Sequence, residues 1–167
     1  MIKENMFTCA ECGKTVEDEK TVLIDNRHIC LACIYGERKP FEIYPIGHVC
    51  NELQRNKRTF GLHGGKNISR IELLPSQKRF MYKLEEEKFL TIVYYLHETK
   101  SVKSVFKRRG NGKKVGVFAS RTPYRLSKIG IQDVRLLKIE GTTLYVEGLD
   151  AINNSPVLDI KVQHNTP

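Results

Sequence analysis

The sequence contains no apolar run that approaches the roughly 20 residues needed for a membrane-spanning helix. Its start, MIKENMF, lacks the apolar core of a secretory signal. Acidic side chains are missing from residues 100–128, which carry ten Lys and Arg. The first two absences predict a cytoplasmic protein without a membrane partner, and the third predicts a strongly basic surface.

The positive charge is concentrated in one part of the chain. Of the formal net charge of +9, residues 1–40 contribute −1 (six basic, seven acidic) and residues 41–167 contribute +10 (twenty-two basic, twelve acidic). A basic patch attracts polyanions and suits contacts with a phosphate backbone. A solvated, lysine-rich face would have the same composition. The candidate nucleic-acid contacts are Lys107, Arg108, Arg109, Lys113 and Lys114.

Four of the five cysteines form two C-x-x-C pairs, Cys9 with Cys12 and Cys30 with Cys33, and seventeen residues separate the pairs. This spacing is typical of a structural zinc site, because each pair can reach one ion and two pairs complete a tetrahedron. Two disulfides are an alternative, which the lack of an export signal disfavours. A redox centre is another alternative, although it would not need two pairs. His28 could replace one cysteine as ligand, and Cys50, which has no partner, is expected to fill the core.

The remaining sequence predicts a β-rich fold. The chain is long enough for one domain and a small module, and Lys39-Pro40 suggests a boundary between a zinc-ribbon-like module (1–40) and a second domain (41–167). No helical pattern alternates with the strands, which disfavours a doubly wound sheet. We expect a mainly β, closed or nearly closed barrel with one or two short helices. The expected strands cover residues 41–50 (broken at Pro45), 69–74, 89–96, 114–118, 129–139, 143–147 and 157–162, and a helix begins at Pro75-Ser76 with Phe80, Met81 and Leu84 as its apolar stripe.

Two segments carry a resemblance to a known family. They read GVFASRTPYRLSKIGI from Gly116 to Ile131 and GLDAINNSPVLDIKV from Gly148 to Val162. Together they resemble the TsaA-like family, also called TrmO, whose pattern runs approximately G-V-F-A-T-R-S-P-x-R-P-N-P-I-G-L and G-x-D-x-x-D-G-T-P-V-L-D-I-K. The resemblance covers roughly residues 41–163. It implies a small β-barrel that binds S-adenosylmethionine, forms a homodimer and methylates N6 of an adenosine near the tRNA anticodon.

The resemblance also implies where the cofactor binds. Arg121, Arg125 and Ile131 match the first motif, and Arg121 suits an ion pair with the methionine carboxylate. The D-G-T-P turn corresponds to Asn153, Asn154, Ser155 and Pro156, whose short polar groups and backbone amides suit ribose hydroxyls. His97 and Glu98 match the end of a strand and are candidates for both cofactor binding and general base. Without the motif, surface salt bridges, core packing of Ile131 and an ordinary hairpin turn would explain the same residues.

The sequence departs from the family pattern at several positions. Leu126-Ser127-Lys128 replaces P-N-P, Asn153 replaces an aspartate, and no P-R-Q triplet occurs in residues 55–66. Two functions therefore stay open. The first is an S-adenosylmethionine-dependent methyltransferase acting on RNA, with tRNA as the expected substrate. The alternative is a non-catalytic module that binds the cofactor or RNA, or a methyltransferase for another acceptor.

Overall fold

The computed structural model describes residues 5–53, 67–108 and 110–163. The chain divides into two compact units. One unit combines Met1–Glu42 with Thr99–Lys128, and the other combines Ile43–Glu98 with Ile129–Pro167.

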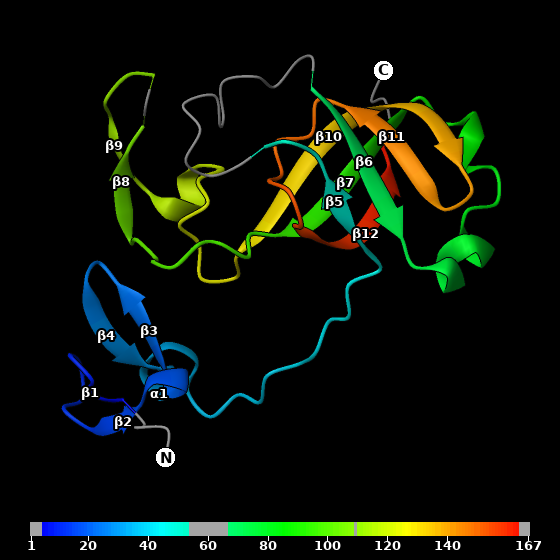
Figure 1. Ribbon diagram of the computed structural model, residues 1–167. Coiled ribbons are helices and arrows are strands. Elements are labelled where there is room, and N and C mark those ends of the chain that lie inside the picture. Colours follow the sequence, from blue (N-terminus) through cyan, green and yellow to red (C-terminus); the bar gives the residue numbers. More distant parts are fainter. Residues whose placement is uncertain (1–4, 54–66, 109, 164–167) are drawn as a thin grey trace. The chain divides into compact units, whose positions relative to one another are not determined.

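The second unit is built around a closed, six-stranded barrel (Figure 1). The order of neighbours around the barrel is β10-β11-β6-β5-β12-β7, and every neighbouring pair is antiparallel. The strands are β5 (Gly47–Cys50), β6 (Ile68–Leu73), β7 (Phe89–Tyr95), β10 (Ile129–Glu140), β11 (Thr143–Glu147) and β12 (Pro156–Val162). Closure leaves this sheet without edge strands.

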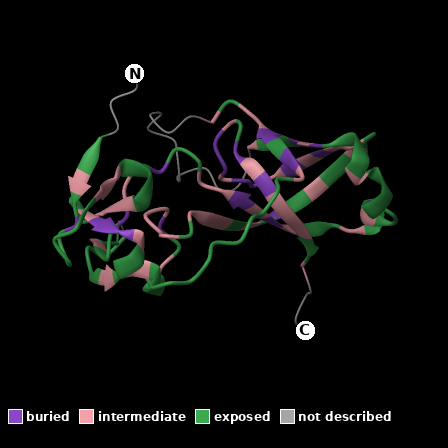
Figure 2. Ribbon diagram, turned by 90° about the horizontal axis from the view of Figure 1, so that it is seen from below, coloured by how far each residue is buried: buried purple, intermediate pink, exposed green. Residues whose placement is uncertain are grey.

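The barrel core follows from alternation along the strands. On β7, Leu90, Ile92 and Tyr94 are buried, whereas the residues between them are half-buried. Each strand contributes inward side chains in the same way, because successive residues of a strand point to opposite faces. Figure 2 shows these buried positions along the barrel strands. The core cluster contains Val49, Ile71, Leu73, Met81, Leu90, Ile92, Tyr94, Val134, Leu144, Val146, Leu149, Ala151 and Val157.

The first unit consists of three small antiparallel ribbons. They pair β1 (Met6–Thr8) with β2 (Thr15–Glu17), β3 (Thr21–Ile24) with β4 (Arg27–Cys30), and β8 (Val105–Lys107) with β9 (Lys114–Gly116). The only α-helix among the described residues is α1 (Leu31–Tyr35), and 3-10 turns cover Asp18–Lys20 and Val117–Ala119.

A two-residue turn shapes the β3–β4 hairpin and links it to the segment after the barrel strand β7. Asp25 and Asn26 both have positive φ, 48° and 64°, as a tight hairpin turn with the twist of its strands requires. Ile24 forms a parallel bridge with Val102, and the Asp25 N–H donates to the Val102 carbonyl at 3.0 Å. The Ser104 Oγ donates to Asp25 Oδ2 at 2.5 Å. These contacts join residues 99–128 to the N-terminal segment.

Most of the fold prediction is confirmed. The protein is mainly β, its barrel is closed, and the predicted strands 69–74, 89–96, 129–139, 143–147 and 157–162 correspond to β6, β7, β10, β11 and β12. The domain boundary predicted between residues 40 and 41 stays a prediction, to which the structure adds the grouping of residues 99–128 with the N-terminal segment. None of the helices in the described part of the chain is long and apolar enough to cross a membrane.

The structure differs from the sequence prediction in local detail. The predicted helix begins at Pro75 as expected, but it consists of two 3-10 segments, Pro75–Phe80 and Leu84–Glu86. The left-handed Lys83 (φ 62°) directly precedes the second segment. Phe80, expected on its apolar stripe, is 74% exposed. Residues 41–44 form no strand, and the strand predicted there starts only at Gly47.

The basic segment 107–114 spans the connection between two strands, because Lys107 ends β8 and Lys114 begins β9. The predicted strand 114–118 correspondingly ends at Gly116, where a 3-10 turn takes over.

Candidate functional site

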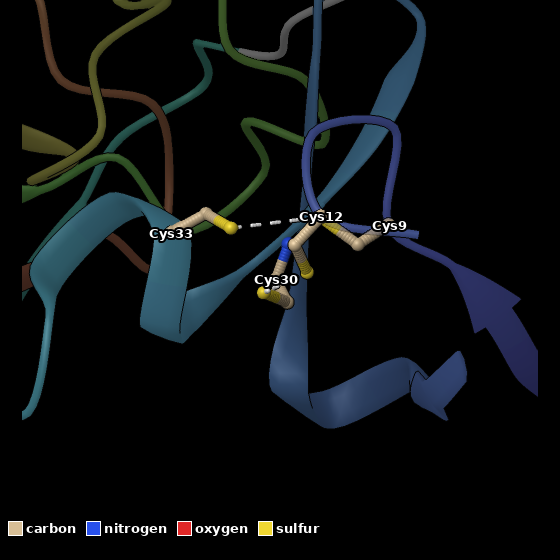
Figure 3. A group of neighbouring side chains, drawn as sticks. All are labelled: Cys9, Cys12, Cys30 and Cys33. Atoms are coloured by element: carbon tan, nitrogen blue, oxygen red, sulfur yellow. Dashed lines mark hydrogen bonds between the residues drawn. The ribbon is translucent and has the colours of Figure 1, made fainter. Parts of the chain in front are cut away.

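The two C-x-x-C pairs meet in the first unit. Cys9 and Cys12 lie in the turn after β1, Cys30 ends β4, and Cys33 lies on α1. Figure 3 shows the four side chains gathered around one point. Their sulfur atoms all lie within 4.8 Å of one another. The sequence prediction that these four residues cluster is therefore correct.

The distances in this cluster match a tetrahedral metal site. Cys9 Sγ lies 3.9 Å from Cys33 Sγ, and Cys12 Sγ lies 3.8 Å from Cys30 Sγ. Four sulfurs about 2.3 Å from one zinc ion would lie about 3.8 Å apart. These two distances therefore fit a zinc ion held by the four sulfurs.

Backbone amides support thiolate character at one of these cysteines. The N–H groups of Cys30 and Glu11 donate to Cys9 Sγ at 3.3 and 3.4 Å. Together with the Cys12 amide, these donors lower the pKa of Cys9 to about 6. The pKa of Cys33 is raised, first by its hydrogen bond with Cys30. An ion would replace the protons that the four sulfurs share.

His28, the alternative ligand, is engaged elsewhere. Its ring stacks on Phe7 with a centroid distance of 3.8 Å, and its Nδ1 lies 3.3 Å from Thr21 Oγ1. The site is therefore a four-cysteine cluster, and His28 packs beside it.

On the barrel, the family motifs are brought onto adjacent strands. Val93 of β7 lies between Ile131 of β10 and Asp159 of β12 in one row across the sheet. These positions lie between the inward-pointing residues of each strand and therefore face outward. Ile131 is 54% exposed and forms no part of the core. The core-packing alternative for Ile131 is thus wrong, and an apolar side chain is available on the surface. Asp159 pairs with Lys161 at 2.6 Å.

The turn that matches D-G-T-P is held by the barrel. The N–H of Asn153 donates to the Leu53 carbonyl at 2.9 Å, and that of Asn154 donates to the Val49 carbonyl at 2.8 Å. The Ser155 N–H donates to Ile152 at 3.1 Å. The expectation that this turn offers free backbone amides is therefore wrong for Asn153, Asn154 and Ser155.

The Ser155 side chain differs from the backbone amides of this turn, because its hydroxyl forms no hydrogen bond within the described residues. Ser155 is 1% exposed, and its Oγ is a buried polar atom without a hydrogen-bond partner among the described residues. A buried hydroxyl without a partner costs roughly 1–3 kcal/mol. It marks the turn as a place where a polar ligand atom would be stabilised. Pro156 follows it and begins β12.

Asn51 is a residue that sequence reasoning missed. Its N–H donates to Asn153 Oδ1 at 3.0 Å, and its side-chain amide donates to Ser69 Oγ and to the Ala151 carbonyl, each at 2.9 Å. These hydrogen bonds of Asn51 fix the turn that contains Asn153. Its position directly after a strand that ends at Cys50 is the only signal in the sequence.

The other candidates for cofactor binding are more exposed. His97 and Glu98 form an exposed turn shortly after β7. Arg121 and Arg125 belong to the first unit. Arg121 is exposed, whereas the Arg125 guanidinium donates to the Ser120 carbonyl. The backbone carbonyl of Arg125 accepts from the Lys128 N–H at 3.3 Å.

The basic residues gather on the β8–β9 hairpin. Lys107 and Lys114 are directly opposite each other in its register, and both are exposed, as are Arg108 and Lys113. Arg108 also donates to the Ala119 carbonyl at 2.5 Å. Like charges on opposite strand positions repel and so favour a bound anion. Arg109 lies outside the described residues, as do residues 55–66, where the P-R-Q triplet is missing.

Comparisons with known proteins agree with these motifs. Residues 61–165 match the model of the tRNA-methyltransferase O N-terminal domain. A tRNA (adenine(37)-N6)-methyltransferase of Mus musculus is 40% identical over 81 residues, which is 47% of this chain and 19% of the relative. A probable S-adenosyl-L-methionine-binding protein of Pyrococcus horikoshii is 30% identical over 128 residues, covering 73% of this chain and 82% of the relative.

The fold agrees as well. A crystal structure of TrmO superimposes with a TM-score of 0.61 and 26% identity, covering 75% of this chain and 58% of that one. This chain spans only about a fifth of the mouse enzyme. The family model nevertheless matches well over half of the residues of the present chain. The chain therefore belongs to the family of the tRNA-methyltransferase O N-terminal domain.

Proposed function

We propose that this protein is an S-adenosylmethionine-dependent methyltransferase that acts on tRNA, at N6 of an adenine. The observation that carries the proposal is the match of residues 61–165 to the tRNA-methyltransferase O domain on a closed barrel. The relatives named above supply the reaction class: one is named for adenine N6 methylation of tRNA and another for binding the cofactor.

The barrel offers suitable groups for the cofactor. Ser155 Oγ is buried and lacks a partner among the described residues, so a ligand hydroxyl could satisfy it. Ile131 provides an exposed apolar wall for an adenine ring. Asn153, Asn154 and Pro156 form the rest of the turn. In the other unit, Arg121 is an exposed cation of the kind that pairs with a carboxylate. Arg125, which donates to the Ser120 carbonyl, would position this segment.

The cofactor would supply an electrophilic methyl group on a sulfonium. The protein's part is to bring the adenine amine into line with that group and to exclude water. An amine that forms a new N–C bond must lose a proton. His97 and Glu98, adjacent in an exposed turn, are the candidate bases.

The four-cysteine cluster is proposed to hold a structural zinc ion, because its Sγ–Sγ distances of 3.8 and 3.9 Å equal the edge of a zinc–thiolate tetrahedron. Lys107, Arg108, Lys113 and Lys114, with Arg109, are proposed to contact the phosphate backbone of tRNA. A homodimer in the cytoplasm completes the proposal. Light scattering of the purified protein measures the dimer directly.

The test combines binding and transfer. The full chain is incubated with S-adenosylmethionine carrying a labelled methyl group and with unmodified tRNA, and the nucleosides are then separated by mass spectrometry. Labelled N6-methyladenosine supports the proposal. Calorimetry in parallel measures cofactor affinity for the wild type and for Arg121→Gln, which should bind at least about fivefold more weakly if one ion pair is lost.

Two outcomes would overturn the proposal. Cofactor binding without label in any tRNA would assign the protein to the alternative classes, a binding module or a methyltransferase for another acceptor. Lack of cofactor binding would remove the methyltransferase class altogether.

A further inference from the structure

A second cluster of metal-ligating side chains lies on the outer face of the barrel. On β5, Val49 is fully buried, so its neighbours His48 and Cys50 both point away from the core. On β6, Ile71 is fully buried, and Glu72 points outward in the same way. Cys50 was expected in the core, and this expectation is wrong, because the strand alternation puts it on the half-buried outer face.

The register brings the three side chains together. His48 lies directly opposite Glu72 in the antiparallel β5–β6 pair, and Cys50 follows two residues after His48 on the same face. Opposite residues have Cβ atoms only about 5 Å apart. The ligand atoms of His48, Cys50 and Glu72 all lie within 4.8 Å of one another, and His48 Nε2 lies 3.6 Å from Glu72 Oε2.

The chemistry of this set suits a divalent ion. Imidazole, thiolate and carboxylate are the three side-chain types that bind zinc, at about 2.0–2.3 Å. Ligands around such an ion lie roughly 3.3–3.5 Å apart, so the observed His48–Glu72 distance requires little movement. Three protein ligands leave one position of a tetrahedron open, and the half-exposed His48 and Glu72 side chains (49% and 39%) leave that position open to water.

We propose that His48, Cys50 and Glu72 form a second metal site, which binds one zinc-like divalent ion with an open coordination position. The site belongs to the barrel unit and is separate from the four-cysteine cluster in both residues and ligand chemistry. It uses none of the residues proposed for the cofactor. The inference therefore stands or fails independently of the methyltransferase activity.

The neighbouring cation Arg70 provides a second test of the proposed metal site. Arg70 lies opposite Cys50, and its Nη2 is 3.5 Å from Glu72 Oε1. Exposed ion pairs of this kind stabilise a protein little, so a divalent ion can displace the guanidinium from the carboxylate. Arg70 contributes no ligand atom and repels a cation. Its removal should leave the site intact and strengthen metal binding.

Cadmium provides a probe that separates the two sites. The full chain is titrated with ¹¹³Cd²⁺, which substitutes for zinc, and the bound metal is counted after dialysis. The ¹¹³Cd NMR spectrum should show two resonances, one from the four-sulfur cluster and one at lower chemical shift from a site with a single sulfur. The wild type should bind two ions per chain.

The variants decide between the outcomes. His48→Gln, Cys50→Ser and Glu72→Gln should each remove the second resonance and weaken that site by at least about tenfold, since even indirect partners of a metal contribute that much. The first resonance should not change. Arg70→Gln, a substitution on the same face, should keep the second resonance. One bound ion per chain, a second resonance that persists in all three ligand variants, or its loss in Arg70→Gln would overturn the proposal.

Discussion

The ring of Tyr94 occupies the space where a side chain on Gly130 would lie. A Cβ atom built on Gly130 would come within 2.5 Å of the Tyr94 ring. The two residues are register partners on β7 and β10. The glycine of the family's I-G pair is therefore required by packing, and Tyr94 is a core residue that is unavailable for stacking on a base.

Replacing Gly130 with alanine should destabilise the barrel. The added methyl group must push the buried Tyr94 ring aside, and overpacking of this kind costs about 1–3 kcal/mol. Urea denaturation measures the change in the free energy of unfolding. Gly110→Ala is the matched control, since nothing lies within 4 Å of that position and its stability should hardly change. Equal effects of the two substitutions would refute the packing argument.

Burial of Tyr94 should make the protein sensitive to alkali. Burial raises the pKa of Tyr94 to about 12, from an ordinary value of 10.0. The folded state favours the neutral phenol, so the contribution is complete below pH 10 and is lost as the pH rises from 10 through 12. The loss amounts to about 2–3 kcal/mol. Tyr94→Phe should remove this part of the pH dependence, measured as the free energy of unfolding at pH 9 and 11. An unchanged pH profile in that variant would contradict the prediction.

Removal of the zinc ion proposed at the four-cysteine cluster should unfold the N-terminal ribbons and leave the barrel folded. Among the described residues, the buried core of this cluster contains only Ile29 besides Cys9 and Cys30, with Val16, Ile24 and Ile34 partly buried. So small a core needs the metal for its folding free energy. A chelator should abolish hydrogen-exchange protection of β3 and β4 while β7 stays protected. Cys33→Ser should have the same effect without chelator. Protection of β3 and β4 in the metal-free protein would disprove the structural role.

Removal of one lysine from the β8–β9 hairpin should weaken RNA binding and stabilise the hairpin. Lys107 and Lys114 repel each other across the hairpin. Lys114→Gln relieves this repulsion and removes about one phosphate contact, which should lower the salt slope of tRNA binding by about one. Filter binding at several salt concentrations measures the slope. Lys20→Gln is the control, because Lys20 is paired with Glu17 at 2.6 Å. A salt slope that is unchanged in Lys114→Gln would exclude this hairpin from the RNA interface.

Substitutions at Ser155 and Ser69 should have opposite effects on stability. Ser155→Ala removes a buried hydroxyl that has no partner in the described structure, so the free protein should be equally or more stable. Its affinity for S-adenosylmethionine should fall by about twofold to about twelvefold if one hydrogen bond of about 0.5–1.5 kcal/mol is lost. Ser69→Ala removes one of the two acceptors of the Asn51 side-chain amide and should destabilise the protein. Thermal unfolding and calorimetry measure both quantities. Unchanged cofactor affinity in Ser155→Ala would show that the hydroxyl meets no ligand.

The sequence predicted those parts of the fold that local patterns determine. The run from Phe89 to Tyr95 is rich in β-branched and aromatic residues, which favour a buried strand, and the C-x-x-C spacing defined the cysteine cluster. The helix predicted from Pro75 is divided into two 3-10 segments, and the apolar spacing gives no sign of the left-handed Lys83 before the second one. The outward position of Cys50 depends on which face of its strand is buried, and this cannot be inferred from the cysteine alone.

Long-range pairing was beyond the reach of sequence reasoning. No sequence pattern predicts that the Asn153 side chain accepts a hydrogen bond from the Asn51 N–H, which lies 102 positions earlier in the chain. The bridge between Ile24 and Val102 is likewise not predicted by any sequence pattern. Motifs nominated the candidate residues of the site, whereas the contacts that hold those residues required the folded structure.

The bonds from Asp25 to Val102 and Ser104 also bear on how the protein can be dissected. A shortened version starting near residue 41 would discard the β3–β4 hairpin and strip residues 99–128 of their anchor. Such a fragment would change the very segment that carries Arg121 and the basic hairpin. Loss of RNA methylation in it would say little about the ribbon's own role, and point substitutions at the cysteines give the cleaner comparison.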